Sequence, residues 1–148
     1  MKLLILSLFA CFALNQVNGQ EEDLTFKVTN FEVNGVNRDD IALECDVALS
    51  FYMCNDTTLC FANQWRKSDS QSYGGVFAIK KRTTEETSTT YGYDELKFTW
   101  HFFNTYDSDR GEAAVTFTTI KIGNTFKFIA EILVLDTNEV LRFKGYLE

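Results

Sequence analysis

The sequence predicts an all-β fold, on three observations. Residues that favour extended chain are abundant, since 148 residues include fourteen phenylalanines and six tyrosines and no proline. Apolar residues recur at every second position in segment after segment, as in strands with one buried face. Turn residues separate these segments about every ten residues. We therefore expect an antiparallel β-sandwich of about eight strands, with a small calycin-like β-barrel as the alternative.

Residues 1–19 have the pattern of a signal peptide. Lys2 precedes the apolar run LLILSLFACFAL, and Val17 and Gly19 are the small residues expected before a cleavage site at Gln20. The run is shorter than a membrane span, so no transmembrane segment is expected. We expect residues 20–148 to form a single secreted, extracellular β domain.

The first expected strand covers residues 24–33. Leu24, Phe26 and Val28 alternate with polar residues, and the apolar phase then slips, which indicates a β-bulge near Thr29 and Asn30. Asn34 and Gly35 follow as a turn.

The second expected strand covers residues 41–54, where every odd position from 41 to 53 is apolar. Further strands are expected at 61–67, 75–82, 94–103, 112–122, 125–135 and 139–147. The last three should form two linked hairpins with tips at 122–125 and 136–138. The polar stretches 68–75 and 83–94 are expected to be loops.

Three cysteines remain after removal of the leader. If residues 55–59 form a hairpin loop, Cys54 and Cys60 face each other across the ladder at the spacing that a disulfide needs. Cys45 would lie far along the same strand on the buried face, as a free apolar thiol. Two alternatives are an intermolecular disulfide through Cys45 and a Cys45–Cys60 pair that leaves Cys54 free.

Asn55 begins the triplet Asn55-Asp56-Thr57, an N-glycosylation acceptor. The triplet lies where the strand alternation stops, between two cysteines, in a chain with an export signal. We therefore predict that Asn55 carries a glycan.

Catalytic motifs are missing from the sequence. No nucleophile elbow, phosphate-binding glycine loop or zinc motif is present. The single histidine, His101, falls on the wetter face of its strand, which favours a structural role. We therefore do not expect an enzyme.

The charge of the chain argues against nucleic acid as a partner. Lys2 lies in the leader, so 13 basic residues face 21 acidic ones in residues 20–148, a net charge of −8.

Acidic residues in loops suggest a calcium-dependent module as one interpretation, with no other cofactor expected. Calcium needs several oxygen ligands that converge from loops. The ligands would come from five aspartates: Asp39, Asp40, Asp107, Asp109 and Asp136.

The many aromatic residues allow a second interpretation, a lipocalin-like carrier with a small apolar ligand inside a barrel. The size and the export signal fit such a carrier. The GxW motif expected in its first strand is absent, because Trp65 in ANQWRK has no glycine two residues before it.

Three segments resemble the C2-like amino-terminal module of Notch ligands of the Delta and Jagged type. They are LTFKVTNFEVNG (24–35), CDVALSFYMC (45–54) with CFANQW, and ELKFTWHF (95–102). The cysteine pairs and spacings of that module are not reproduced. The resemblance implies a C2-type sandwich that binds at an extracellular surface through loops at one end.

The function that we expect first is therefore recognition of an extracellular protein or cell-surface partner. Rigid scaffolds commonly present such contacts on loops. The expected contact loops are 36–40, 68–75, 83–94 and 104–111.

Overall fold

The computed structural model describes residues 23–88 and 91–148, without the side chains of 83–91. The predicted signal peptide, residues 1–19, lies outside the described residues. Within the described ranges, no helix has both the length and the apolar character needed to cross a membrane. The elements in chain order are β1 (Leu24–Val33), β2 (Val36–Asn37), α2 (Asp39–Glu44), β3 (Val47–Met53), β4 (Leu59–Trp65), β5 (Ser70–Ser88), β6 (Tyr91–Asn104), β7 (Arg110–Ile122), β8 (Thr125–Val134) and β9 (Val140–Leu147).

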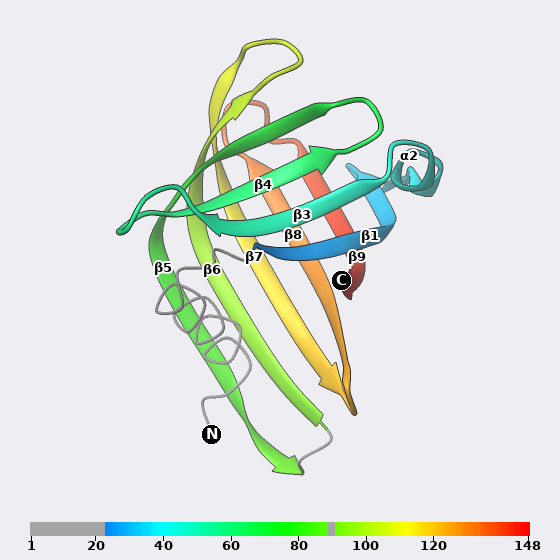
Figure 1. Cartoon of the computed structure of the whole chain (residues 1–148), viewed down its shortest axis with the longest axis vertical. Coiled ribbons are helices and arrows are strands. Elements are labelled where there is room, and N and C mark those ends of the chain that lie inside the picture. Colours follow the sequence, from blue (N-terminus) through cyan, green and yellow to red (C-terminus); the bar gives the residue numbers. More distant parts are fainter. Residues whose placement is uncertain (1–22, 89–90) are drawn as a thin grey trace.

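The strands form one closed antiparallel barrel (Figure 1). Their order is β2-β1-β3-β4-β5-β6-β7-β8-β9, and β1 also pairs with β9, so the sheet closes on itself. The prediction of an all-β chain is confirmed, and so is its barrel alternative. The expected sandwich is wrong, and the sandwich that the Notch-ligand resemblance implies is not the architecture observed.

Closure depends on β1, which pairs with strands on both of its sides. Phe26 lies opposite Leu49 of β3 and opposite Leu147 of β9. The predicted bulge is present, because the β1–β9 register shifts between Val28 and Asn30. Such a bulge bends its strand and increases the twist, so β1 leaves β3 and follows β9 to its end.

The first part of the expected strand 41–54 is a helix. α2 occupies Asp39–Glu44, and β3 begins only at Val47. The short helix buries Ala42 and packs Ile41 against the core, while Leu43 is exposed. Asp46, with a φ of 50°, then turns the chain into β3. Ile41 and Cys45 are four residues apart, so they share one face in a helical turn as well as in a strand, and both line the interior in the observed helix and the residue after it.

Two expected loops are largely strand. Most of 68–75 lies in β5, and 83–94 is divided between β5 and β6, which form a long hairpin (Figure 1). Their serines and threonines suit a barrel wall, where one side faces solvent. The expected turns at 34–35, 122–125 and 136–138 are confirmed, with positive φ at Asn34, Gly35, Gly123 and Asn138.

One half of the barrel interior is packed with aromatic rings. We call this region the filled half, and it consists of Phe26, Phe51, Phe61, Phe98, Phe117 and Phe128. Phe51 lies 4.9 Å from Phe61 and 5.0 Å from Phe117, measured between ring centroids in tilted and edge-to-face geometries. These rings are buried and in contact with one another, as in the close-packed core of a protein.

Candidate ligand-binding cavity

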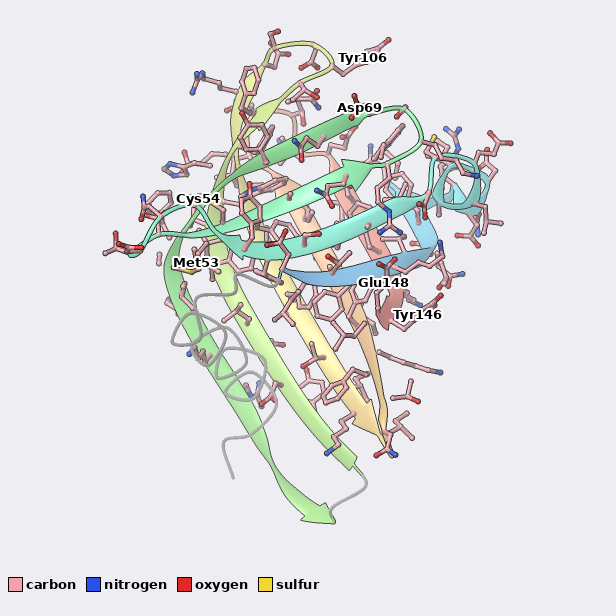
Figure 2. The ribbon with its side chains drawn as sticks, viewed as in Figure 1. Met53, Cys54, Asp69, Tyr106, Tyr146 and Glu148 are labelled. Carbon is pink, nitrogen blue, oxygen red and sulfur yellow. A yellow bond between two sulfur atoms is a disulfide. The ribbon has the colours of Figure 1, made fainter. Side chains whose placement is uncertain are left out.

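The other half of the barrel interior contains a cavity of about 780 Å³, which we call the hollow half. It opens at the end of the barrel where four connections contribute to its lining: the α2 segment, the β4–β5 turn, the β6–β7 loop and the β8–β9 turn. Figure 2 shows Asp69 and Tyr106 on two of these connections, on the side away from Cys54. Tyr106 is 87% exposed at this mouth.

The floor of the cavity is Trp100, which separates it from the filled half. The indole Nε1–H of this buried residue donates a hydrogen bond of 2.9 Å to the Phe61 carbonyl. Its ring contacts Phe61 at 5.1 Å and Phe102 at 4.9 Å between centroids. The donor of the indole is thus satisfied by the wall, and the ring presents an apolar surface to the cavity.

The walls are mainly apolar. The lining side chains come from β1, β4, β5, β6, β8 and β9 and the connections beside them, and α2 adds Ile41 with Cys45 directly after it. The apolar side chains that line the cavity are Phe31, Val33, Ile41, Trp65, Trp100, Phe102, Ile132, Val134 and Leu141. A cavity of this size and lining is of the kind that holds a small organic molecule.

A row of polar side chains crosses one wall. Asn63 of β4 pairs in register with Ser72 of β5, which pairs with Asn104 of β6. Asn104 Nδ2 donates to Ser72 Oγ at 3.0 Å. Asn63 is 9% exposed, and its Oδ1 accepts no hydrogen bond from any described residue. A buried acceptor without a donor is unfavourable, so this atom marks a place for a ligand or a water.

Charged groups among the lining residues lie at the mouth. They are Arg38, which precedes α2, and Glu139, in the β8–β9 turn. Arg38 Nε lies 3.4 Å from Asp40 Oδ1, and its side chain is 44% exposed. No other described residue that lines the cavity carries a formal charge, so its deeper part is neutral.

The predicted disulfide between Cys54 and Cys60 is present, with 5.8 Å between the Cα atoms. Cys45 is a free thiol, as predicted, but it follows α2 and is only partly buried, so its expected place on a strand is wrong. Its thiol borders the cavity.

Asn55 lies exposed in the β3–β4 loop. Its Oδ1 accepts hydrogen bonds from the Thr57 amide and hydroxyl at 2.9 and 3.1 Å. The side chain is accessible for modification, and its glycosylation stays a prediction.

The five aspartates proposed for calcium do not form one cluster. In residues 23–88 and 91–148, no three His, Cys, Asp or Glu side chains gather in a way that could hold a metal ion. Asp39 binds protein groups instead: it accepts from the Phe31 amide at 2.8 Å and from Asn37 at 3.1 Å. These hydrogen bonds, the Phe31 amide first, lower the pKa of the Asp39 carboxyl.

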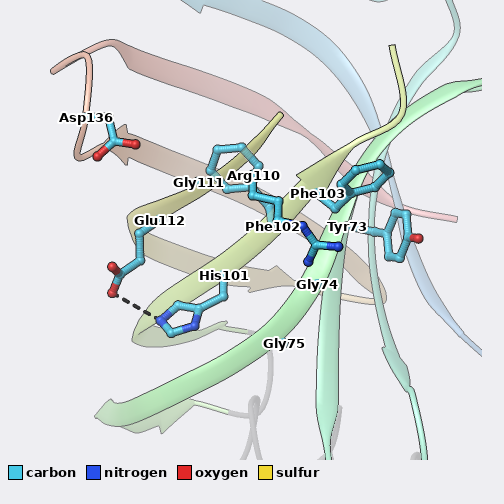
Figure 3. Close-up of a pocket in the computed structure, with 10 residues that line it drawn as sticks. All are labelled: Tyr73, Gly74, Gly75, His101, Phe102, Phe103, Arg110, Gly111, Glu112 and Asp136. Atoms are coloured by element: carbon cyan, nitrogen blue, oxygen red, sulfur yellow. Dashed lines mark hydrogen bonds and ion pairs between the residues drawn. The ribbon is translucent and has the colours of Figure 1, made fainter. Parts of the chain in front are cut away.

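His101 projects from the outer wall, as its strand phase predicts. Its Nε2 lies 3.1 Å from Glu112 Oε1 in a shallow depression over β5, β6 and β7 (Figure 3). Gly74 allows the close approach of β5 here, since a Cβ at this position would overlap the His101 carbonyl oxygen. Asp136 borders the same depression, which is open to solvent.

A network of ion pairs holds the outer seam where β1 leaves β3. Asp46 lies 2.9 Å from both Lys27 and Arg66, and Arg66 reaches Glu148 at 2.6 Å. Hydrogen bonds from Arg66 and Lys27 lower the pKa of Asp46 to about 2. The hydrogen bond from Arg66 likewise lowers the pKa of Glu148.

Sequence reasoning did not identify Asn63 or Ser72. A signal for Asn63 was present, because Phe61, Asn63 and Trp65 share one phase of an expected strand, so a polar residue falls among apolar ones. The sequence contains no such signal for Ser72, because a polar residue is not unusual in the loop expected at 68–75. Of the expected contact loops, only 104–111 is largely a loop, and it lies beside the mouth. The segment 36–40 consists of β2, Arg38 at the mouth and the start of α2, and most of 68–75 and 83–94 is strand.

Comparison with known proteins places the chain in no family. No family model, no curated protein and no solved structure matches it.

Proposed function

We propose that this protein binds a small, mainly apolar molecule inside its barrel and carries it in the extracellular space. This is the function of the lipocalin-like alternative. The observation that supports it is the division of one barrel into a filled half and a hollow half with a cavity of about 780 Å³. Closed barrels of eight strands have an interior that side chains fill or that holds one small ligand.

The chemistry of the lining supports an apolar ligand. Aromatic and aliphatic side chains cover most of the surface, and burial of apolar area drives binding by roughly 25 cal/mol per Å². The charged lining residues Arg38 and Glu139 stand at the mouth, where water can solvate them. A secreted chain of this kind would give a poorly soluble molecule a dry site in an aqueous fluid.

Recognition of a protein partner through the loops remains a prediction. The segment 36–40 and the loop within 104–111 border the mouth, so a partner there would meet the ligand-bearing end of the barrel. No contact described above favours a protein partner over the cavity. Calcium dependence is the weakest alternative, because the five aspartates are dispersed.

Ligand binding can be measured directly, because both tryptophans, Trp65 and Trp100, line the cavity. Titration with a neutral apolar fluorophore such as N-phenyl-1-naphthylamine, with energy transfer from tryptophan as the signal, should give saturable binding of one molecule per chain. Organic extraction of protein secreted by its source cells should release a stoichiometric small molecule. Absence of both signals would refute the proposal.

A matched pair of variants places the binding in the cavity. Val134→Phe adds volume to the hollow half, whereas Leu133→Phe makes a similar change at the next residue, whose side chain lies on the other face of β8. We expect Val134→Phe to weaken binding by about tenfold or more, through loss of space, and Leu133→Phe to leave it unchanged. Equal binding by both variants would place the fluorophore elsewhere.

A further inference from the structure

We propose that the ligand carries a neutral hydroxyl group, bound between Asn63 and Ser72. This inference rests on the proposed function and specifies the class of molecule that the cavity accepts: an apolar alcohol or phenol. It starts from two polar side chains on neighbouring strands whose hydrogen-bonding capacity the protein does not use in full.

The two side chains are adjacent. Asn63 and Ser72 are direct partners in the β4–β5 ladder, and both line the cavity. Cβ atoms of such partners lie roughly 4.5–5.5 Å apart. No hydrogen bond joins these two side chains among those that the described residues form, so a small polar group of a ligand can reach both.

Their unused atoms are complementary. Asn63 Oδ1 needs a donor, because it is buried and accepts from no described residue. Ser72 Oγ already accepts from Asn104 Nδ2 at 3.0 Å, so its own O–H remains to be donated. A ligand hydroxyl can donate to Asn63 and accept from Ser72 at the same time, which an ether or a hydrocarbon cannot do.

Charged head groups fit this position poorly. A carboxylate only accepts hydrogen bonds, so it would leave Asn63 Oδ1 without a donor. It would also lack a cation, since Arg38 stands at the mouth beside Asp40. A protonated amine would lack an anion in the same way, because Glu139, the lining carboxylate, also belongs to the mouth.

The orientation of the ligand follows from the lining. The polar row lies on one wall, and apolar side chains, Trp65 and Phe31 among them, surround the remaining space. The hydroxyl therefore lies against β4 and β5, and the apolar body extends over the indole and phenyl surfaces. This arrangement satisfies the buried amide and keeps apolar atoms out of water.

The test uses three probes with one carbon chain: dodecanol, dodecyl methyl ether and dodecanoate at neutral pH. Binding is measured through tryptophan fluorescence of the full secreted protein. We expect dodecanol to bind about tenfold more tightly than the ether, as one satisfied pair of hydrogen bonds allows. Dodecanoate should bind more weakly than dodecanol.

The outcomes separate this inference from the proposed function. Equal affinity for alcohol and ether would overturn the inference and leave the carrier intact, since an ordered water would then satisfy Asn63. Tighter binding of dodecanoate would overturn it in favour of a head group at Arg38. If none of the three probes binds, the proposed function fails as well.

Variants identify the side chains involved. Asn63→Leu should abolish the preference for the alcohol while it retains the ether, and Ser72→Ala should reduce the preference severalfold. Ser70→Ala is the matched control, because Ser70 lines the same cavity but its hydroxyl pairs with Ser68 Oγ at 3.0 Å. An unchanged preference in Asn63→Leu, or a loss in Ser70→Ala, would contradict the assignment.

Discussion

The filled half and the hollow half of the barrel have opposite interiors although the same strands run through both. On β4, the inward phase passes from Phe61 to Asn63 and Trp65. On β6, it passes from the buried Phe98 to Trp100, Phe102 and then Asn104. The strand period therefore decides which side chains point inward, and their size and polarity decide whether the interior is solid.

The two halves of the barrel interior contribute to different properties: the filled half to stability and the hollow half to ligand binding. Phenylalanines in tilted and edge-to-face contact supply close packing and large buried area in the filled half. The hollow half lacks such packing, and it contains a buried acceptor, Asn63 Oδ1, without a donor among the described residues. Proteins commonly carry such local costs at functional sites.

The largest expected effect compares two phenylalanines of β6. Phe98→Ala should lower the free energy of unfolding by about 3–5 kcal/mol, because it leaves a cavity among packed rings. Phe102→Ala should lower it by only about 1–2 kcal/mol, because this ring already borders empty space. Urea unfolding measures both values. Equal losses in the free energy of unfolding would show that the two halves of the interior are packed equally well, which would contradict the comparison.

Removal of the disulfide tests the end opposite the mouth. The double variant Cys54→Ser, Cys60→Ser should lower the free energy of unfolding by about 2 kcal/mol, since the closed loop is short. Ligand affinity should stay unchanged, because neither cysteine lines the cavity and the β3–β4 loop lies at the strand ends opposite the connections that form the mouth. A large loss of affinity in a folded variant would show that the two ends are coupled.

A smaller effect of the opposite sign is expected in the hollow half. Asn63→Leu removes a buried acceptor that lacks a donor and adds apolar contacts, so it should raise the free energy of unfolding of the ligand-free protein by about 1 kcal/mol. Thermal or urea unfolding measures the change. Destabilisation beyond 1 kcal/mol would mean that the protein itself uses this amide.

The smallest effect concerns the ion pairs of Asp46 on the outside of the barrel, which belong to neither half of the interior. Hydrogen bonds lower the pKa of Asp46 from 3.8 to about 2 in the folded protein. Because the folded pKa is the lower one, the stabilisation of the folded protein by these hydrogen bonds is complete above about pH 5 and is lost as the pH falls through about 2. Asp46→Asn should cost less than about 1 kcal/mol at neutral pH, because the pairs are partly exposed.

Acid unfolding provides the readout for this prediction. The variant should lose less stability than the unaltered protein as the pH falls from about 5 to about 2. Ligand affinity at neutral pH should not change. Identical acid profiles of the two proteins would contradict the assigned role of Asp46.

Much of the fold could be predicted from local pattern. The strand 24–33 with its bulge and the hairpin tips near Gly123 and Asn138 have signals that a few neighbouring residues carry. The Cys54–Cys60 disulfide followed from loop length and strand pairing. The prediction of a strand at 41–46 is wrong, because Ile41 and Cys45 share one face in a helical turn as well as in a strand. The prediction of a loop at 68–75 is wrong for most of its residues, because polar residues such as serine also occur on the strands of a barrel wall.

The sequence by itself determined that this chain is built of antiparallel strands, because a two-residue period and turn residues act locally. Only the tertiary structure decided that the sheet closes, because closure depends on β1 pairing with both β3 and β9 across the length of the chain. It also decided where the cavity lies, since an empty interior depends on side chains that strands distant in sequence bring together. Asn63 and Ser72 become a candidate site only because that closure places them on the wall of a hollow barrel.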